Sequence, residues 1–208
     1  TGTLTIPDTV EEIGEGAFAN VSGLKTIIIP GTVKEIGTNA FTNNADLTRV
    51  VLEEGIEIIG EEAFKECRNL ETIELPESLV SIGASAFQDC NKLNNVKIPS
   101  KITVIRAMTF YSCDNLSNIT LQENLQEIQR NAFLSCSQLD NIYISKSVSN
   151  IANSAFNSCT NLVNIEISEE NKKYSYSEDN GMLIDTENNN IVFISSVVLN
   201  NTTTFSIP

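Results

Sequence analysis

The most reactive side chains in this chain are five cysteines that recur at one fixed interval. Cys67, Cys90, Cys113, Cys136 and Cys159 occupy every twenty-third position. A zinc site needs convergent CxxC-like pairs, and no such pair occurs. A disulfide framework needs varied spacings, and Cβ atoms in one regular file lie slightly beyond disulfide reach. The spacing therefore favours buried free thiols that act as small apolar residues, with disulfides between adjacent repeats and a metal or catalytic role as the alternatives.

Other groups that could do chemistry are few. The chain has no His, which excludes His-based triads, His-ligated zinc and His general bases within these residues. It also has no Gly-rich phosphate loop, and its carboxylates are spread over different predicted loops. Asp179, Asp185 and Glu187 raise the alternative of a calcium loop, but the segment lacks the Gly and the final Glu of an EF-hand, which favours a polar turn. We expect no enzyme, no cofactor and no metal site.

Composition and charge narrow the choice of partners. The chain is 41% hydrophobic, enough for a folded core, and its net charge is -14. Clustered Lys and Arg, which a phosphate backbone requires, are missing, so nucleic acid is not an expected partner. The acid is interpreted as a solvated surface, with a basic partner or loosely held divalent cations as the alternative. No apolar stretch approaches the roughly 18 residues of a membrane span, so no membrane insertion is expected in this fragment.

The elements that must position these groups follow the same period as the cysteines. Seven Phe residues recur at this interval without an insertion: Phe18, Phe41, Phe64, Phe87, Phe110, Phe133 and Phe156. Leu stands at the sixth position after each Phe, and Ile at the fifth position before it. The repeated unit can be written LxxIxIPxxVxxIGxxAFxxCxx.

Within this unit, two short segments have the pattern of strands. The Ile-x-Ile of LxxIxI alternates with a period of two, is rich in β-branched residues and ends at a Pro in four repeats. V-x-x-I predicts a second short extended segment, and Gly14, Gly37, Gly60 and Gly83 then supply a turn with an unusual backbone angle. Arg106 and its later equivalents show that positive φ is not required there. A unit of this size cannot bury its own apolar side, so neighbouring copies must stack, with parallel strands and ladders of equivalent residues.

The repeated unit resembles the leucine-rich repeat of the BspA-like, or Treponema pallidum, type. That resemblance implies a right-handed solenoid, mainly β, in which the LxxIxI strands form a parallel concave sheet and the V-x-x-I and Ala-Phe segments build the convex side. It also implies bacterial surface proteins that work in adhesion. The sequence departs from the pattern at Val21 and Asn44 in place of Cys, at the MTF of the fifth repeat, and where Gln122, Ser145 and Ser168 replace Pro. We expect these changes to loosen packing locally.

Three segments are predicted along the chain. Residues 1–168 hold seven 23-residue repeats, and residues 169–201 form an irregular β-hairpin insert, in which TENNN separates the apolar runs GMLID and IVFIS. Residues 202–208, TTTFSIP, resemble TGTLTIP at the start and are expected to begin a further repeat. The chain starts without Met, so we expect a fragment of a longer protein, with any export signal and anchor outside it.

Function is expected on the outward positions of the strands, because the inward positions are committed to packing. At the tenth position after each Phe, the varied residues include Ile28, Val51, Glu74, Lys97 and Tyr143. At the eighth position, Asn95, Asn118, Asn141 and Asn164 form a file whose amides either bond to each other or make a track for a glycan or peptide. We predict an extracellular or cell-surface module whose concave face binds a host, neighbouring-cell or matrix protein. A rigid spacer array and a glycan-binding surface are the alternatives.

Overall fold

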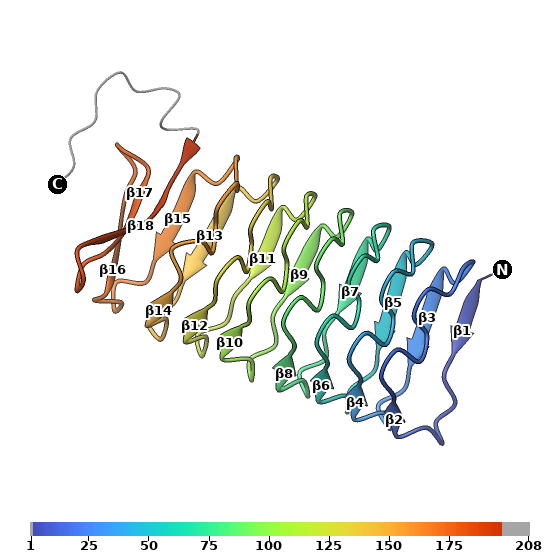
Figure 1. Cartoon of the computed structure of the whole chain (residues 1–208). Helices are drawn as coiled ribbons and strands as arrows, with labels where there is room; N and C mark the ends of the chain where they lie inside the picture. Colours follow the sequence, from blue (N-terminus) through green and yellow to red (C-terminus); the bar gives the residue numbers. More distant parts are fainter. Residues whose placement is uncertain (1, 197–208) are drawn as a thin grey trace.

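Each repeat forms one turn of a β-solenoid, and the turns stack along a single axis (Figure 1). The structure, a computed structural model, describes residues 2–196. Parallel sheets run along the stack, which confirms the predicted leucine-rich repeat fold. The described residues contain no helix that is both long and apolar enough to cross a membrane.

The LxxIxI segments form the longer strands, all parallel and offset by one repeat. Thr26 pairs with Arg49, and Ile28 pairs with Val51. Along β3, Ile27 and Ile29 are buried while Thr26 and Ile28 point outward, as a period of two requires. Six of these strands form one sheet: β1 (Thr3–Thr5), β3 (Thr26–Ile29), β5 (Arg49–Leu52), β7 (Thr72–Glu74), β9 (Asn95–Lys97) and β11 (Asn118–Thr120). A second sheet continues the stack with β13 (Asn141–Ile144) and β15 (Asn164–Ile167).

The V-x-x-I segments form short strands on the opposite side of each turn. Each places its Ile in the core, from Ile13 to Ile151. The first sheet holds β2 (Glu12–Ile13), β4 (Glu35–Ile36), β6 (Ile58–Ile59) and β8 (Ser81–Ile82). The second holds β10 (Val104–Ile105), β12 (Glu127–Ile128) and β14 (Asn150–Ile151).

The glycines after these short strands have a role different from the predicted one. Gly60 and Gly83 do not adopt positive φ; instead, they let successive backbones approach closely. A methyl group on Gly60 would lie 2.7 Å from the backbone carbon of Gly37, and one on Gly83 would overlap the backbone of Gly60. The next turn has Arg106 here, and the paired strands break at this point, between β8 and β10. Arg106, Gln129 and Ala152 follow the strands of the second short-strand sheet, which pair with one another, so the close approach of the glycines is a feature of the first four turns.

The left-handed backbone occurs beside the Phe residues. Around Phe64, Glu62 and Glu66 have φ values of 56° and 59°. The Phe64 N–H donates to the Ala86 carbonyl at 2.8 Å, and the Glu66 N–H donates to the Gln88 carbonyl at 2.8 Å. The same bonds recur along the stack, so the Ala-Phe segments add a third hydrogen-bonded ladder to the two sets of strands.

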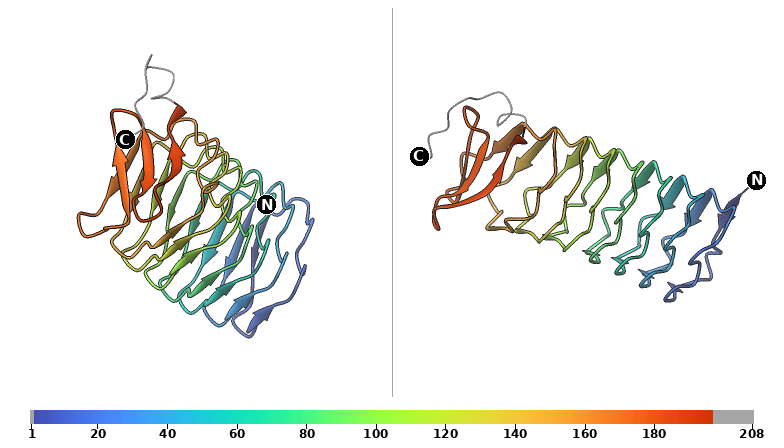
Figure 2. Two further views of the ribbon diagram at one scale, coloured as in Figure 1. Left: turned by 60° about the vertical axis from the view of Figure 1, so that its left-hand side comes forward. Right: turned by 45° about the horizontal axis from the view of Figure 1, so that its top comes forward.

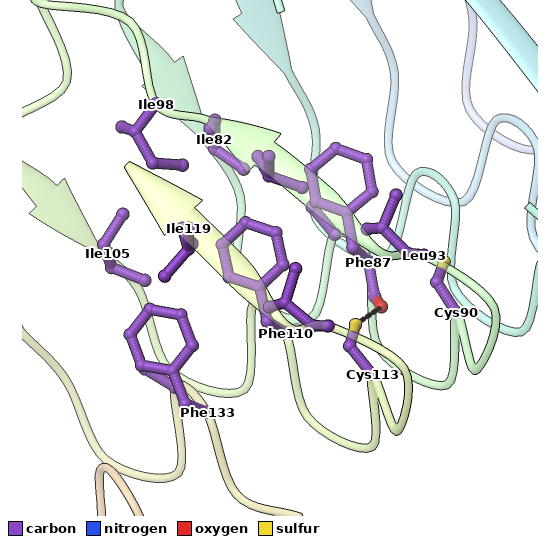
Figure 3. Close-up of a cluster of buried hydrophobic side chains, with 14 of the residues drawn as sticks. Ile82, Phe87, Cys90, Leu93, Ile98, Ile105, Phe110, Cys113, Ile119 and Phe133 are labelled. Carbon is purple, nitrogen blue, oxygen red and sulfur yellow. Dashed lines mark hydrogen bonds between the residues drawn. The ribbon is translucent and has the colours of Figure 1, made fainter. Parts of the chain in front are cut away.

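The core is a stack of rings with aliphatic ladders beside it (Figure 3). Successive Phe rings from Phe18 to Phe156 lie nearly parallel, with centroids 5.2–5.7 Å apart and interplanar angles of 1–11°. The rings from Phe41 to Phe156 are completely or almost completely buried. Phe18, in the first turn, is only partly buried and has a ring neighbour on one side.

The five cysteines lie buried as free thiols in one file, and they also donate hydrogen bonds. Each Sγ donates to the carbonyl of the Phe in the preceding turn at 3.0–3.2 Å, as Cys113 does to Phe87 (Figure 3). Burial raises the pKa of Cys67 to about 12. Asn44, which stands where later turns have Cys, is fully buried and its Nδ2 donates to both Phe18 and Phe41 carbonyls at 2.8 Å. Here the departure from the repeat is accommodated by two hydrogen bonds.

A three-stranded antiparallel sheet covers the last turn (Figure 2). It consists of β16 (Tyr174–Ser177), β17 (Met182–Asp185) and β18 (Asn190–Ile194). GMLID and IVFIS form β17 and β18, which pair antiparallel, whereas β16 had no sequence signal. Phe193 meets Phe156 edge-on at 6.1 Å and 74°, and the Tyr174 hydroxyl accepts a bond from the Ile151 N–H at 2.9 Å. We refer to β16–β18 as the cap; the repeat expected at residues 202–208 lies outside the described residues.

Candidate ligand-binding face

The outward side chains of the longer strands form two parallel rows, which together we call the sheet face. These strands are β3, β5, β7, β9, β11, β13 and β15. The first row, at the eighth position after each Phe, consists of Thr26, Arg49, Thr72, Asn95, Asn118, Asn141 and Asn164. The second row, at the tenth position, consists of Ile28, Val51, Glu74, Lys97, Thr120, Tyr143 and Glu166. All nine side chains predicted to bind a ligand lie in these rows, and all are partly or fully exposed. Their use in binding stays a prediction.

The second row changes its chemistry along the stack. Ile28 and Val51 are partners in adjacent strands, so they form a small apolar surface near the N-terminal end. Tyr143 is half-buried and pairs in register with the exposed Glu166. Glu74 and Lys97 are exposed between these two ends. This row therefore presents an apolar part, a charged part and an aromatic part.

A depression of about 530 Å³ lies over β7, β9 and β11. Its apolar lining comes from Ile73, Leu75 and Val96, and its polar lining from Glu74, Glu77, Asn95, Lys97, Asn118 and Thr120. Here the sheet face is hollowed, with both polar groups and aliphatic surface accessible.

Lys97, at this depression, is held by an ion pair. Its Nζ lies 2.8 Å from Glu77 Oε1, and Glu77 Oε2 accepts bonds from the Ser100 N–H and Oγ–H at 3.1 Å. The bonds from Lys97, and then from Ser100, lower the pKa of Glu77 to about 2. Glu77 was not predicted from the sequence. The repeat could have indicated its contact with Ser100, because Ser100 occupies the equivalent position in the next turn of the solenoid. The cation of Lys97 is therefore partly neutralised before any ligand arrives.

The four Asn side chains do not bond to one another in the part of the chain that the structure describes. Asn95 Nδ2 donates to Asn94 Oδ1, and Asn141 Nδ2 donates to Asp140 Oδ1. Among residues 2–196, the side chains of Asn118 and Asn164 make no hydrogen bond. The predicted ladder of amides is thus absent within this range, and the amides point outward with donors and acceptors available.

A second depression, of about 370 Å³, lies where the sheet face meets the cap. Its polar lining includes Asn164, Glu166, Ser175 and Glu178. The Tyr176 hydroxyl fixes this junction by donating to the Val163 carbonyl at 2.8 Å. Ser175 and Glu178 could not be found from sequence, because the strand that carries Ser175 was not predicted.

Asp185, one of the three carboxylates considered for calcium, accepts hydrogen bonds within a turn. Asp185 Oδ1 accepts bonds from the N–H groups of Glu187 and Asn188 at 3.0 and 3.1 Å, and Lys173 Nζ lies 3.7 Å from Oδ2. Across residues 2–196, no group of three or more Cys, Asp or Glu side chains is placed to hold a metal ion. The polar-turn interpretation of this segment fits these contacts.

Comparison with known proteins identifies the family. Residues 2–106 and 80–206 match the BspA type leucine rich repeat region, in 6 copies. The chain belongs to the BspA-type leucine-rich repeat family. None of the curated proteins matches it.

Solved structures of bacterial leucine-rich repeat proteins are similar to this BspA-type chain. A leucine rich cell surface protein from Faecalibacterium prausnitzii is 30% identical with a TM-score of 0.82, over 92% of this chain and 53% of its own. A leucine-rich repeat protein from Bacteroides ovatus is 30% identical with a TM-score of 0.76, over 81% and 46%. The leucine rich repeat protein of T. pallidum is 33% identical with a TM-score of 0.66, over 68% of each chain.

The BspA-type chain spans about half the length of the first two of these proteins. The leucine-rich repeat family and fold are typical of binding modules that act through protein interactions.

Proposed function

We propose that this chain is a non-enzymatic adhesion module, extracellular or at a cell surface, whose sheet face binds a host, neighbouring-cell or matrix protein. The varied chemistry of the second row carries this proposal. Ile28 and Val51, then Glu74 and Lys97, then Tyr143 follow each other on a scaffold whose inward residues repeat in every turn. A folded protein partner has no internal period of one solenoid turn, so a non-repeating row is suited to such a partner.

The similarity to a Faecalibacterium prausnitzii protein described as a cell surface protein supports the proposed location. The partly exposed apolar pair Ile28 and Val51 supports a protein contact, because apolar surface beside charged side chains acts as an interface anchor. The rigid, hydrogen-bonded stack holds these side chains in place before binding, which reduces the ordering cost of association.

The test is binding of the purified chain to immobilised matrix proteins, measured by surface plasmon resonance. The double variant Ile28→Glu, Val51→Glu replaces the apolar pair with two charges. The matched control is Val80→Glu, because Val80 is 48% exposed and lies beside β8, away from the sheet face. Thermal melting of each variant checks that the fold is retained.

Saturable binding that the double variant loses and the control retains supports the proposal. Binding that both variants retain would place the contact on another surface. If no matrix or cell-surface protein binds, the chain is better explained as a rigid spacer that displays other domains.

A further inference from the structure

The first row of the sheet face differs from the second because it becomes regular. From β9 onward, every outward position in this row is Asn: Asn95, Asn118, Asn141 and Asn164. Asn95 is in register with Asn118, and Asn141 with Asn164. All four are exposed, so their identity is not dictated by packing.

These amides are available to a ligand. Within residues 2–196, none of the four bonds to another, and two of them are oriented by the residue before them, Asn94 or Asp140. An amide carries both donors and acceptors, so it can meet hydroxyl or acetamido groups in either orientation. The row ends in two depressions, one containing Asn95 and Asn118 and the other containing Asn164.

We propose that the row of Asn95, Asn118, Asn141 and Asn164 is a binding track for a neutral, extended, β-1,4-linked polysaccharide, with one sugar on each solenoid turn. This track uses a different row from the protein contact proposed above and does not depend on it. A repeating row of identical groups is suited to a repeating polymer, as a varied row is suited to a folded protein.

The spacing of the turns favours a polysaccharide over a peptide. Hydrogen-bonded strands lie about 4.8 Å apart, whereas an extended peptide advances about 3.3 Å per residue and about 6.6 Å per side chain on one face. A peptide lying along the axis would therefore lose register with the amides after the first turn. In an extended β-1,4-linked hexose chain, the length of one sugar along the polymer is close to the distance between neighbouring turns of the solenoid.

The track stays continuous where the sheet is interrupted between β11 and β13. On the core side of that step, the rings of Phe110 and Phe133 keep a centroid distance of 5.6 Å, within the range of the other steps.

Charge selects a neutral polymer. The chain carries a net charge of -14, and Asp140 and Glu166 lie exposed beside the amides. The cation of Lys97, next to the row, is paired with Glu77. Sulfated or uronic-acid polymers would be repelled by this surface.

The test is isothermal titration calorimetry of the full chain with β-1,4-linked chito- and cello-oligosaccharides of two to six sugars. Affinity should rise with each sugar up to four, the number of Asn in the row, and change little beyond that. Maltohexaose, which is α-1,4-linked and curved, serves as the control for spacing and should bind weakly or not at all. Equal affinity for maltohexaose, or no binding of any β-1,4-linked hexamer, would overturn the proposal.

Paired variants locate the site. Asn118→Ala should lower affinity for a bound hexamer about three- to tenfold, the effect of losing one or two hydrogen bonds. Asn115→Ala is the matched control, because Asn115 is exposed in the same turn but lies before β11, off the sheet face. Unchanged affinity in Asn118→Ala and in the double variant Asn118→Ala, Asn141→Ala would refute the track.

The two proposals can fail separately. Ile28→Glu, Val51→Glu lies in turns that carry no Asn of the row, so it should abolish protein binding without changing hexamer affinity. A chain that binds a protein and no oligosaccharide would keep the proposed function and lose the track. A chain that binds oligosaccharides alone would do the reverse.

Discussion

Phe87→Ala tests whether the stacked rings hold the solenoid together. Phe87 is fully buried between Phe64 at 5.7 Å and Phe110 at 5.5 Å. Its neighbours are fixed by hydrogen bonds on both sides, so they cannot move to fill the space that truncation leaves. We expect a loss of about 3 to 5 kcal/mol in the free energy of unfolding, the range for a buried Phe whose cavity stays open.

Phe18→Ala is the matched comparison, because Phe18 has the same side chain with a ring neighbour on one side only. It is partly exposed, and its removal opens onto solvent instead of forming an enclosed cavity. We expect a smaller cost of about 1 to 2 kcal/mol, since less apolar surface is lost from burial.

Urea denaturation followed by circular dichroism measures both costs. A chain without Trp gives little fluorescence signal, so the β-sheet band is the better probe. If the transition is broad, a nearest-neighbour treatment of the turns replaces the two-state fit. Equal costs for the two variants, or a cost below about 1.5 kcal/mol for Phe87→Ala, would refute the role given to the enclosed ring stack.

Three further predictions follow from contacts between turns. Gly83→Ala should destabilise the chain, because the new methyl group would overlap the Gly60 backbone, whereas Gly14→Ala, with no atom within 4 Å of the new methyl group, should be nearly neutral. The melting temperatures of the two variants check this, and equal shifts would contradict it. The five cysteines should resist a thiol reagent at pH 8 in the folded chain and should all react in urea. They are buried, and burial raises their pKa, that of Cys67 to about 12. Rapid modification of the folded chain would show that the thiols are accessible to solvent. The pKa of Glu77 is lowered from 4.5 to about 2, so the stabilisation from its hydrogen bonds is complete above the unfolded-state pKa and is lost as the pH falls through about 2. An NMR titration of Glu77 should give this midpoint, and Lys97→Met should raise it. An ordinary midpoint in the unaltered chain would disprove the pairing.

The repeat made most of the fold predictable, because a constant period fixes which residues stack and alternation fixes which face inward. Details that depend on contacts between turns were not predictable in this way. The left-handed residues beside Phe64 are both Glu, and other turns use Asn, Ser, Asp, Met or Gly at these positions, so no single residue type marks them. The glycines were interpreted by their own backbone freedom, whereas their role concerns the distance to the next turn.

The sheet face was predictable as a set of positions but not as a set of interactions. Alternation along each strand located Lys97 and the Asn row correctly on one surface. The partner of Lys97, Glu77, lies outside the strands, and the depression beside Asn164 exists only because β16 packs next to β15. Such features arise from the arrangement of neighbouring elements, which the repeat unit alone does not describe.

The stacking of turns determines how the chain responds to mechanical force. Each turn is joined to its neighbours by hydrogen bonds and packing along the axis, so a pull on the two ends loads these contacts in series. A turn that detaches releases one repeat of the chain, which extends to about 80 Å, whereas the turn occupies about 4.8 Å in the stack. At the last turn, the cap adds a further contact, in which Phe193 packs edge-on against Phe156, so this turn is held on both sides (Figure 1). The stack can therefore lengthen many-fold under shear, by one repeat for each turn that detaches.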